Sequence, residues 1–312
     1  MNLKDIVKAW DDFWFRPVSP IPIALFRIAI GFLALVLAVS YLPNLHMWLG
    51  AKGIISLQSS LHVFGRNCIQ LFALLPQGDG WITVFLIVFM TASFMLMIGL
   101  CTRPSTIVVW LGALSLYHRC PNSCNGGEAL LWIFTFYLIF CPAGAAISVD
   151  RLLQVAHGKQ TGPPAFHPPF GQRLIQLYLM IVYLSCFYWK AVGPMWADGT
   201  AVYYAVREDH LWRFSVPYLY EHMWTLKLLT WGTLVVECGV PLLIWIREVR
   251  YVVMAVGILF HLGLEFSMNI PLFQWVTLSA YLTFVEPEDV KSAIEWIRIR
   301  AVGFIHRIRL IY

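Results

Sequence analysis

The chain has 312 residues, of which 59% are hydrophobic and only 12% are charged, and its formal net charge is +5. An average soluble domain carries about 25% charged residues, so this chain has too little polar surface to coat a water-soluble globule. The composition therefore excludes a soluble domain and favours an integral membrane protein.

The apolar residues gather into long runs separated by short polar clusters. A helix needs about 20 apolar residues to cross roughly 30 Å of hydrocarbon. The runs cover 20–42, 80–100, 104–117, 127–141, 174–188, 223–246, 251–266 and 270–285. Apolar and polar residues do not alternate along them, which excludes the strands of an outer-membrane barrel. We predict an all-α fold, a polytopic transmembrane helical bundle of about eight spans, in which the shorter runs are tilted or re-entrant.

Two segments flank the predicted bundle. In residues 1–19 and 287–312, apolar residues recur at helical spacing, and the second segment is also rich in Lys and Arg. Helices of this kind lie on a membrane surface. We therefore expect an interfacial amphipathic helix over 1–19, a transmembrane domain over 20–286 and a basic amphipathic helix over 287–312.

Lys and Arg are concentrated in the segments that would share one side of the membrane with the N-terminus. Cytoplasmic loops carry such an excess, so both termini are predicted to be cytoplasmic and residues 191–221 to be outside. We expect a multi-pass protein of a bacterial plasma membrane, with the lipid bilayer as its partner. This bias accounts for the charge of +5, and no nucleic-acid partner is expected, because there is no basic soluble domain.

Three cysteines, Cys68, Cys120 and Cys124, fall on the predicted outer side. Disulfides persist outside the cytoplasm, so one bridge among the three is expected, with its pairing left open. No metal site is expected, because Cys120 and Cys124 lack a second pair of ligands.

Arg27 and Glu237 lie inside apolar runs, where a charge costs roughly 3 kcal/mol and needs a compensating partner. The simplest interpretation is a structural intramembrane pair that holds helices together. With the orientation above, both residues belong to the cytoplasmic half of the bundle. We therefore expect them to support folding more than chemistry.

Lys190 ends an apolar run where the outer interface should begin. It can be a snorkelling lysine, whose stem is buried and whose amine reaches water. Alternatively, Tyr188, Trp189 and Trp196 partly desolvate the amine, which favours the neutral form that can act as a base. Both interpretations stay open.

His261 should lie about 15 Å deep in its run, at a rise of 1.5 Å per residue. It can be a hydrogen-bond partner of another helix or a catalytic group, and Glu265, one helical turn further on, is placed to pair with it. On the same outer side we expect the pocket residues Arg119, Asn125 and Glu128, beside the Gly126-Gly127 pair, which suits a close backbone approach.

Several of these segments together resemble the HTTM family, the membrane domain shared with vitamin K-dependent gamma-carboxylase. The matching pieces are 22–35, 117–153, 181–206, 233–243 and 257–289, in the order in which the family has them. The most specific are the segment around the buried His261 and the pattern K-x5-W-x2-G-T-A, which begins at Lys190 and includes Trp196.

The resemblance implies an enzyme that acts on a quinone or on a secreted peptide at the outer membrane face. In the carboxylase, a lysine is regarded as the base that deprotonates vitamin K hydroquinone, and that role would fall on Lys190. His261 matches the family's buried histidine, whereas 125–128 match its polar outer loop more loosely. A vitamin K-type or other quinone is the implied cofactor, a small secreted peptide the implied partner, and a carboxylase-like lyase the implied class.

The resemblance also has a limit. The carboxylase carries a large region outside the membrane that binds its protein substrate, and this chain ends shortly after its last predicted span. The rival interpretation is a non-catalytic peptide-handling, transport or scaffold protein. Transporters often contain internal repeats, and we find none here, which favours an enzyme over a transporter.

Overall fold

The computed structural model describes residues 2–50, 53–64, 68–76, 78–120, 125–214 and 217–309, and all its regular elements there are helical. The helices are α1 (Leu3–Phe15), α2 (Ile21–Ser40), α3 (Leu45–Leu49), α4 (Leu57–Phe64), α5 (Asp79–Ile98), α6 (Thr102–Arg119), α7 (Gly126–Leu138), α8 (Val149–Ala156), α9 (Phe170–Ala191), α10 (Pro194–Ala197), α11 (Ala201–Ala205), α12 (Pro217–Glu221), α13 (Met223–Leu243), α14 (Arg250–Ser267), α15 (Phe273–Tyr281) and α16 (Pro287–Arg309), with short 3-10 turns η1 (Leu42–Asn44), η2 (Leu71–Ala73) and η3 (Leu282–Phe284). The prediction of an all-α fold is confirmed.

Within the described ranges, 5 helical segments are long and apolar enough to cross a membrane: Ile21–Leu49, α5, α9, α13 and α14. The transmembrane character is therefore confirmed, whereas the count of about eight spans is not. The run 127–141 forms the 13-residue α7, and 270–285 forms the 9-residue α15 followed by η3. The run 104–117 lies in α6, which has 18 residues but begins and ends in polar ones.

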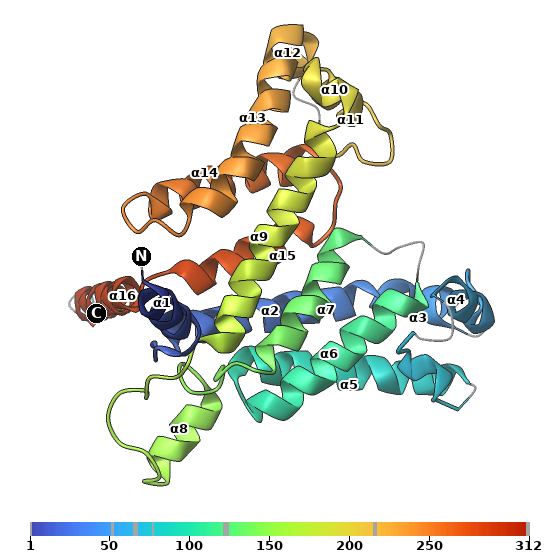
Figure 1. The fold of residues 1–312 in the computed structure, drawn as a ribbon. Coiled ribbons are helices and arrows are strands. Elements are labelled where there is room, and N and C mark those ends of the chain that lie inside the picture. Colours follow the sequence, from blue (N-terminus) through green and yellow to red (C-terminus); the bar gives the residue numbers. More distant parts are fainter. Residues whose placement is uncertain are drawn as a thin grey trace.

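The helices form two groups that share one core. Figure 1 shows α2, α5, α6 and α7 packed side by side, while α9 crosses this group and extends beyond it with α13. Helices α14 and α15 connect the two groups, because α14 packs on α13 and α15 packs on both α2 and α7. The polar groups discussed below lie where these two groups meet.

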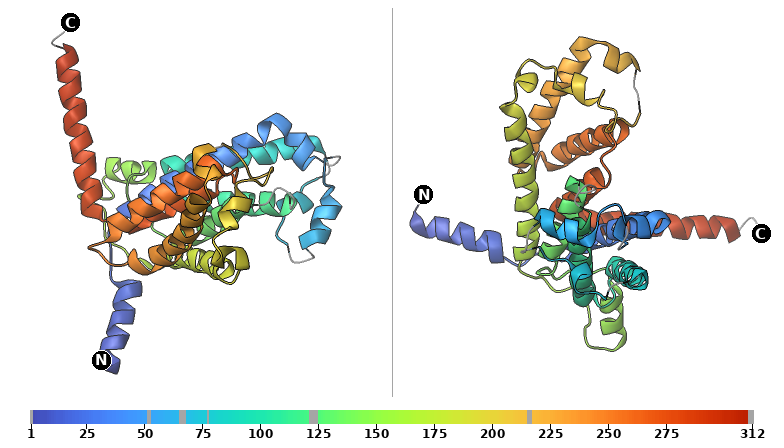
Figure 2. Two further views of the ribbon diagram at one scale, coloured as in Figure 1. Left: turned by 90° about the horizontal axis from the view of Figure 1, so that it is seen from above. Right: turned by 90° about the vertical axis from the view of Figure 1, so that its right-hand side faces the viewer.

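Both terminal helices leave the bundle at one end. In Figure 2, α1 and α16 project from the same end of the molecule in opposite directions. The loop 157–169 lies at this end too, and its His167 pairs with Val18 in an isolated antiparallel bridge (Figure 1). We call this the terminal end. That α1 and α16 lie on a membrane surface stays a prediction.

Local capping explains the corner between α5 and α6 at the terminal end. Helix α5 ends at Gly99, whose φ of 73° is in the left-handed region that glycine adopts at low cost. Helix α6 then begins with backbone donors at Cys101 and Thr102, and both bond the carboxylate of Asp150 at 2.8 Å. Because Asp150 belongs to α8, this cap attaches α8 to the corner.

Arg27 is completely buried in α2, and its guanidinium bonds backbone carbonyl groups rather than a carboxylate. It donates to Ala143 O at 2.8 Å, to Ile147 O at 2.6 Å and to Met97 O at 3.5 Å. Carbonyls at helix ends and in tight turns lack partners within their own element, so they can satisfy this cation. The interpretation of Arg27 as a partner of Glu237 is therefore wrong, although its surroundings are structural, as expected.

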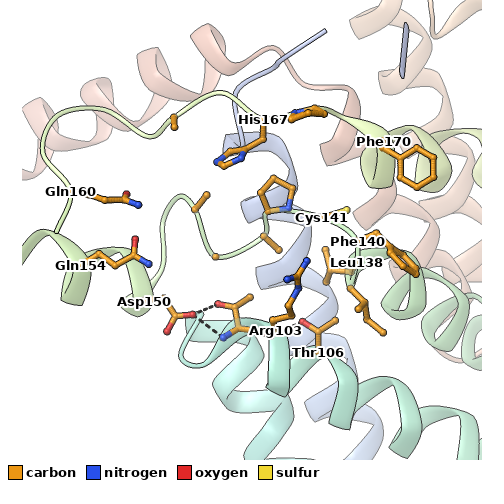
Figure 3. Close-up of a pocket in the computed structure, with 18 of the residues that line it drawn as sticks. Arg103, Thr106, Leu138, Phe140, Cys141, Asp150, Gln154, Gln160, His167 and Phe170 are labelled. Atoms are coloured by element: carbon orange, nitrogen blue, oxygen red, sulfur yellow. Dashed lines mark hydrogen bonds between the residues drawn. The ribbon is translucent and has the colours of Figure 1, made fainter. Parts of the chain in front are cut away.

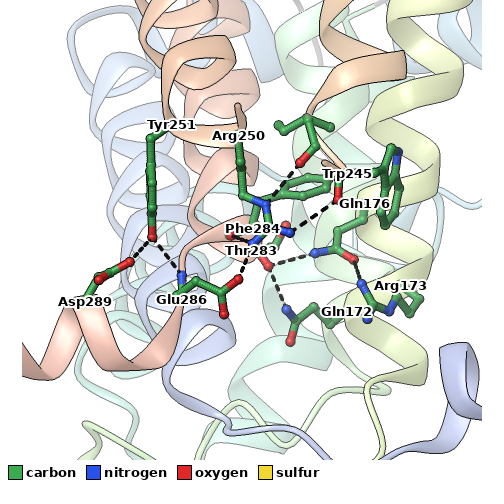
Figure 4. Close-up of polar contacts among 11 residues, drawn as sticks. Gln172, Arg173, Gln176, Trp245, Arg250, Tyr251, Thr283, Phe284, Glu286 and Asp289 are labelled. Carbon is green, nitrogen blue, oxygen red and sulfur yellow. Dashed lines mark hydrogen bonds and ion pairs between the residues drawn. The ribbon is translucent and has the colours of Figure 1, made fainter. Parts of the chain in front are cut away.

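A polar cluster closes the terminal end between α9, α14 and the start of α16 (Figure 4). Gln172 and Gln176 each donate a side-chain N–H to Thr283 O at 2.7 Å. Arg250 forms an ion pair with Glu286 and also donates to Ile244 O at 3.1 Å. The cluster secures the lower part of α9, the helix that carries Lys190 at its other end.

The close packing of α2 on α5 gives a first testable prediction. A Cβ atom added at Gly31 would lie 2.5 Å from Met97 N and 2.7 Å from Met97 Cα, so the backbones must separate. Gly31→Ala is expected to destabilise the protein by about 1–3 kcal/mol. Gly239→Ala is the matched control, because no atom lies within 4 Å of a Cβ added there. Thermal unfolding in detergent checks this, and equal midpoints for both variants would contradict it.

Candidate functional site

Helix α9 presents polar side chains at a spacing of seven residues. Gln176, Tyr183 and Lys190 recur at this interval, and seven residues make about two helical turns, so the three lie on one face. Gln176 and Tyr183 are buried and Lys190 is partly exposed. This face is turned toward α13, α14 and α15, so it carries polar groups into the junction between the two helix groups.

At the end of this face that is remote from the terminal end, the Lys190 ammonium donates to Glu237 Oε1 and forms an ion pair with it. The Lys190 side chain is 27% exposed and that of Glu237 only 7%. The second carboxylate oxygen, Glu237 Oε2, is buried and has no hydrogen-bond partner in the described part of the chain. Glu237 therefore keeps one acceptor available beside the amine.

The expectation that Glu237 stands apart from Lys190 is wrong. The first part of α13 extends past the end of α9 (Figure 1). In this region α10 packs on α9 and α11 packs on α13. A residue in the second half of α13 therefore meets the last turn of α9. Sequence spacing within each run gives no information on this offset.

The segment after Lys190 folds back over it. The centre of the Trp196 ring lies 5.4 Å from Lys190 Nζ, within cation–π range. The amide and hydroxyl of Thr200 bond Asp198 at 2.9 and 2.6 Å, and these hydrogen bonds lower the pKa of the Asp198 carboxyl. Gly199 has a φ of 82°, and a Cβ there would lie 2.9 Å from the Lys227 side chain of α13. The G-T-A part of the pattern thus docks the segment on α13.

The other two aromatic residues expected around Lys190 point elsewhere. Tyr188 and Trp189 are 58% and 72% exposed, so they do not enclose the amine. Residues adjacent in a helix point in different directions, so Tyr188 and Trp189 cannot cover the neighbouring Lys190 side chain. The burial of this amine therefore depends on Trp196 and Glu237.

Two turns deeper, His261 of α14 lies in a buried hydrogen-bond chain. Its Nε2 is 2.5 Å from the Tyr183 hydroxyl, which is in turn 2.6 Å from the hydroxyl of Tyr281. Its Nδ1 bonds Gln274 Oε1. Since a carbonyl oxygen only accepts, Nδ1 carries the proton and Nε2 accepts from Tyr183. All four side chains are less than 5% exposed.

The start of α7 lies against the same region. Asn125 caps this helix, accepting from Gly127 N at 2.7 Å and from Glu128 N at 3.3 Å. A Cβ added at Gly127 would lie 2.4 Å from Phe273 N, directly before Gln274. The expected close backbone approach at this glycine pair is therefore confirmed. Glu128 is buried, and its Oε2 has no partner in the parts of the chain described above.

Two residues expected in the pocket have other partners. Arg119 donates to the backbone carbonyls of Leu49, Gly50 and Ile55 at 3.1, 3.0 and 2.8 Å, so it secures a loop instead of lining the site. The expected partnership of Glu265 with His261 is wrong as well. Glu265 forms an ion pair with Arg213, because the histidine ring is turned inward to Tyr183 and Gln274.

Sequence reasoning missed Tyr183, Tyr281 and Gln274. Tyrosines are common in apolar runs and carry no charge, so neither stood out. Gln274 had a usable signal, because it is an isolated amide within PLFQWVTLSAY. Its Nε2 is buried and unpaired among the described atoms, which adds a third available polar group to those of Glu237 and Glu128.

Lys190 and His261 do not touch; they are connected only through the shared face of α9. Two cavities lie elsewhere: one of about 800 Å³ at the terminal end (Figure 3) and one of about 440 Å³ around Arg207 and Trp212. A cavity common to Lys190 and His261 thus stays a prediction. In the described ranges, no three His, Cys, Asp or Glu side chains gather as they would around a metal ion.

The expected disulfide stays a prediction as well. Cys68 has a free thiol, and Cys124 lies outside the described residues.

A search of sequence families adds one finding. The model of the HTTM domain matches residues 15–288, which is most of the chain. The match covers α2 to α15 and therefore every residue of the site described above. No solved structure matches the chain.

Proposed function

Because the chain belongs to the HTTM family, we propose that it is a membrane enzyme in which Lys190 and Glu237 together accept a proton from the substrate. The observation that carries the proposal is the ion pair of these two residues, with one carboxylate oxygen left unpaired. Buried polar groups without a partner in the protein are rare, and such a carboxylate oxygen can accept a hydrogen bond from a substrate.

An ammonium group cannot act as a base, so Lys190 must first lose a proton. Glu237 Oε1 already accepts a hydrogen bond from Nζ, so a proton can move along this bond from the amine to the carboxylate. Moving the proton to Glu237 leaves the Lys190 amine neutral. Lys190 can then accept the proton of a bound hydroxyl group, while Glu237 holds the first one.

A quinone fits this site by the chemistry of the available groups. Glu237 Oε2 can accept from a phenolic hydroxyl, and the Trp196 ring can pack against an aromatic ring. A bound hydroquinone would supply reducing equivalents and an ionisable hydroxyl group. A carboxylase-like reaction on a secreted peptide at the outer face is the form of this activity that the gamma-carboxylase resemblance suggests.

The direct test uses the purified protein in lipid nanodiscs with a vitamin K-type naphthohydroquinone and oxygen. Oxygen uptake and conversion of the hydroquinone to its epoxide and water are followed by electrode and by chromatography. Turnover that depends on Lys190 supports the proposal. Turnover indistinguishable from empty nanodiscs would contradict it for this class of substrate.

The rival is a protein that binds a peptide without changing it. Two features fit that alternative: the many aromatic, partly exposed side chains of 194–214 and 217–221, and the 440 Å³ cavity that residues such as Arg207, Trp212 and Tyr220 line. Neither accounts for a buried ion pair with an unpaired oxygen. We therefore favour an enzyme over a protein that only binds a peptide.

The orientation follows from the Lys and Arg bias, and we propose that the terminal end is cytoplasmic. Gln160 and Glu208 are both exposed, at the terminal end and near α11 respectively. In a variant whose native cysteines are all replaced, a membrane-impermeant thiol reagent added to intact cells is expected to label a cysteine at 208 but not one at 160. The opposite labelling pattern would reverse the orientation.

A further inference from the structure

One cavity lies away from Lys190 and His261, at the terminal end. It has a volume of about 800 Å³ and is bounded by the start of α6, the end of α7, α8 and the loop that leads into α9. Figure 3 shows Arg103 rising into it from α6 and His167 facing it from the loop. Pockets of 300–1,000 Å³ commonly hold small organic ligands.

The polar side of this cavity favours an anion. The guanidinium of Arg103 and the side chains of Gln154 and His167 have no hydrogen-bond partner within the described ranges and border the cavity. The acid in the lining, Asp150, is already engaged by three donors, the amides of Cys101 and Thr102 and the Thr102 hydroxyl. Its acceptor capacity is therefore largely used by α6.

Further cations lie immediately behind the lining. Arg27 donates to Ala143 O, and Ala143 is part of the cavity wall. Arg151 is buried next to Asp150 in α8 and donates to Gly162 O at 2.8 Å. With Arg103, three arginines therefore lie in or behind the cavity wall, against the single carboxylate of Asp150 in the lining, so the local charge is positive.

The opposite side of the cavity is apolar. Leu138, Phe140 and Phe170 line it, and Phe140 and Phe170 are 49% and 42% exposed. An amphiphile with an anionic head and a hydrocarbon tail matches both sides. The amphipathic helices α1 and α16 leave the bundle at this same end, and we expect them on the membrane surface, which is the depth of the lipid head groups.

We propose that this cavity binds a phosphate-bearing ligand, the head group of an anionic phospholipid, with Arg103 contacting the phosphate and Leu138, Phe140 and Phe170 contacting the first part of the acyl chains. Basic pockets between helices on the cytoplasmic side of membrane proteins recognise such head groups. The proposal does not depend on the activity proposed for Lys190.

The test is native mass spectrometry of the full-length protein in detergent with phosphatidylglycerol, phosphatidylcholine or soluble glycerol phosphate added at equal concentrations. The wild type is expected to retain phosphatidylglycerol in preference to phosphatidylcholine. Arg103→Gln should weaken this retention about tenfold, because a charge-assisted hydrogen bond is lost. Arg247→Gln is the control, since Arg247 is an exposed arginine in the loop between α13 and α14, outside the cavity lining.

Each outcome decides one point. Loss of phosphatidylglycerol in Arg103→Gln but not in Arg247→Gln supports the site, provided that both variants keep the wild-type melting temperature. If glycerol phosphate binds as well as the lipid, the phosphate site stands but its source is soluble. Unchanged retention in Arg103→Gln, or equal losses in both variants, would overturn the proposal.

Discussion

Replacing either member of the Lys190–Glu237 pair is expected to lower stability, and replacing both is expected to restore much of it. Removing one partner of a buried ion pair costs about 3–5 kcal/mol, because the remaining charge is uncompensated. Lys190→Met should be the more damaging change, because Glu237 is almost fully buried and cannot reach water. After Glu237→Leu, the partly exposed Lys190 can extend toward the interface.

The double variant Lys190→Met/Glu237→Leu separates stability from chemistry. Apolar side chains of similar volume often replace a buried ion pair without loss of stability. Thermal unfolding should therefore place the double variant near the wild type, while hydroquinone turnover stays absent in all three variants. A stable double variant that retains wild-type turnover would show that the pair is only structural. A double variant as unstable as the sum of the singles would show that the two charges are not coupled.

The sequence was sufficient for the class of fold because the composition leaves lipid as the only solvent that suits this chain. Lys190 and His261 were singled out because polar groups in apolar runs need partners, and both have partners in the structure, whereas their catalytic role stays a prediction. The partners themselves were assigned wrongly. Arg27 bonds carbonyl groups, and Glu265 bonds Arg213, because the vertical offsets and rotations of the helices are set by packing between distant segments.

The predicted count of about eight spans is not confirmed, for a related reason. Runs such as 127–141 and 270–285 are as apolar as true spans, yet they form a short α7 and α15 that pack against each other and on α2. An apolar run predicts burial, and burial among other helices looks the same in sequence as burial in lipid. The glycines at 126 and 127 predicted a close backbone approach correctly, because only a residue without a Cβ atom leaves room for a neighbouring backbone there.

His261 can be replaced by alanine, which removes both of its hydrogen bonds, or by isosteric residues that each keep one of them. His261→Ala leaves Gln274 without a partner and opens a space in the core, so a loss of about 2–4 kcal/mol is expected. This is a large part of the roughly 5–15 kcal/mol that stabilises a typical domain. The folded yield in detergent should fall accordingly.

His261→Asn and His261→Gln distinguish packing from proton transfer. Asparagine places an amide near the position of Nδ1 and can keep the bond to Gln274, whereas glutamine reaches the position of Nε2 and can keep the bond to Tyr183. Both variants should therefore unfold at a higher temperature than His261→Ala. If the imidazole passes protons, hydroquinone turnover falls about 10²–10⁴-fold in both, because an amide does not titrate. If His261→Gln retains wild-type turnover and His261→Asn does not, His261 positions Tyr183 through a hydrogen bond, and the chemistry belongs to Lys190 and Glu237 alone.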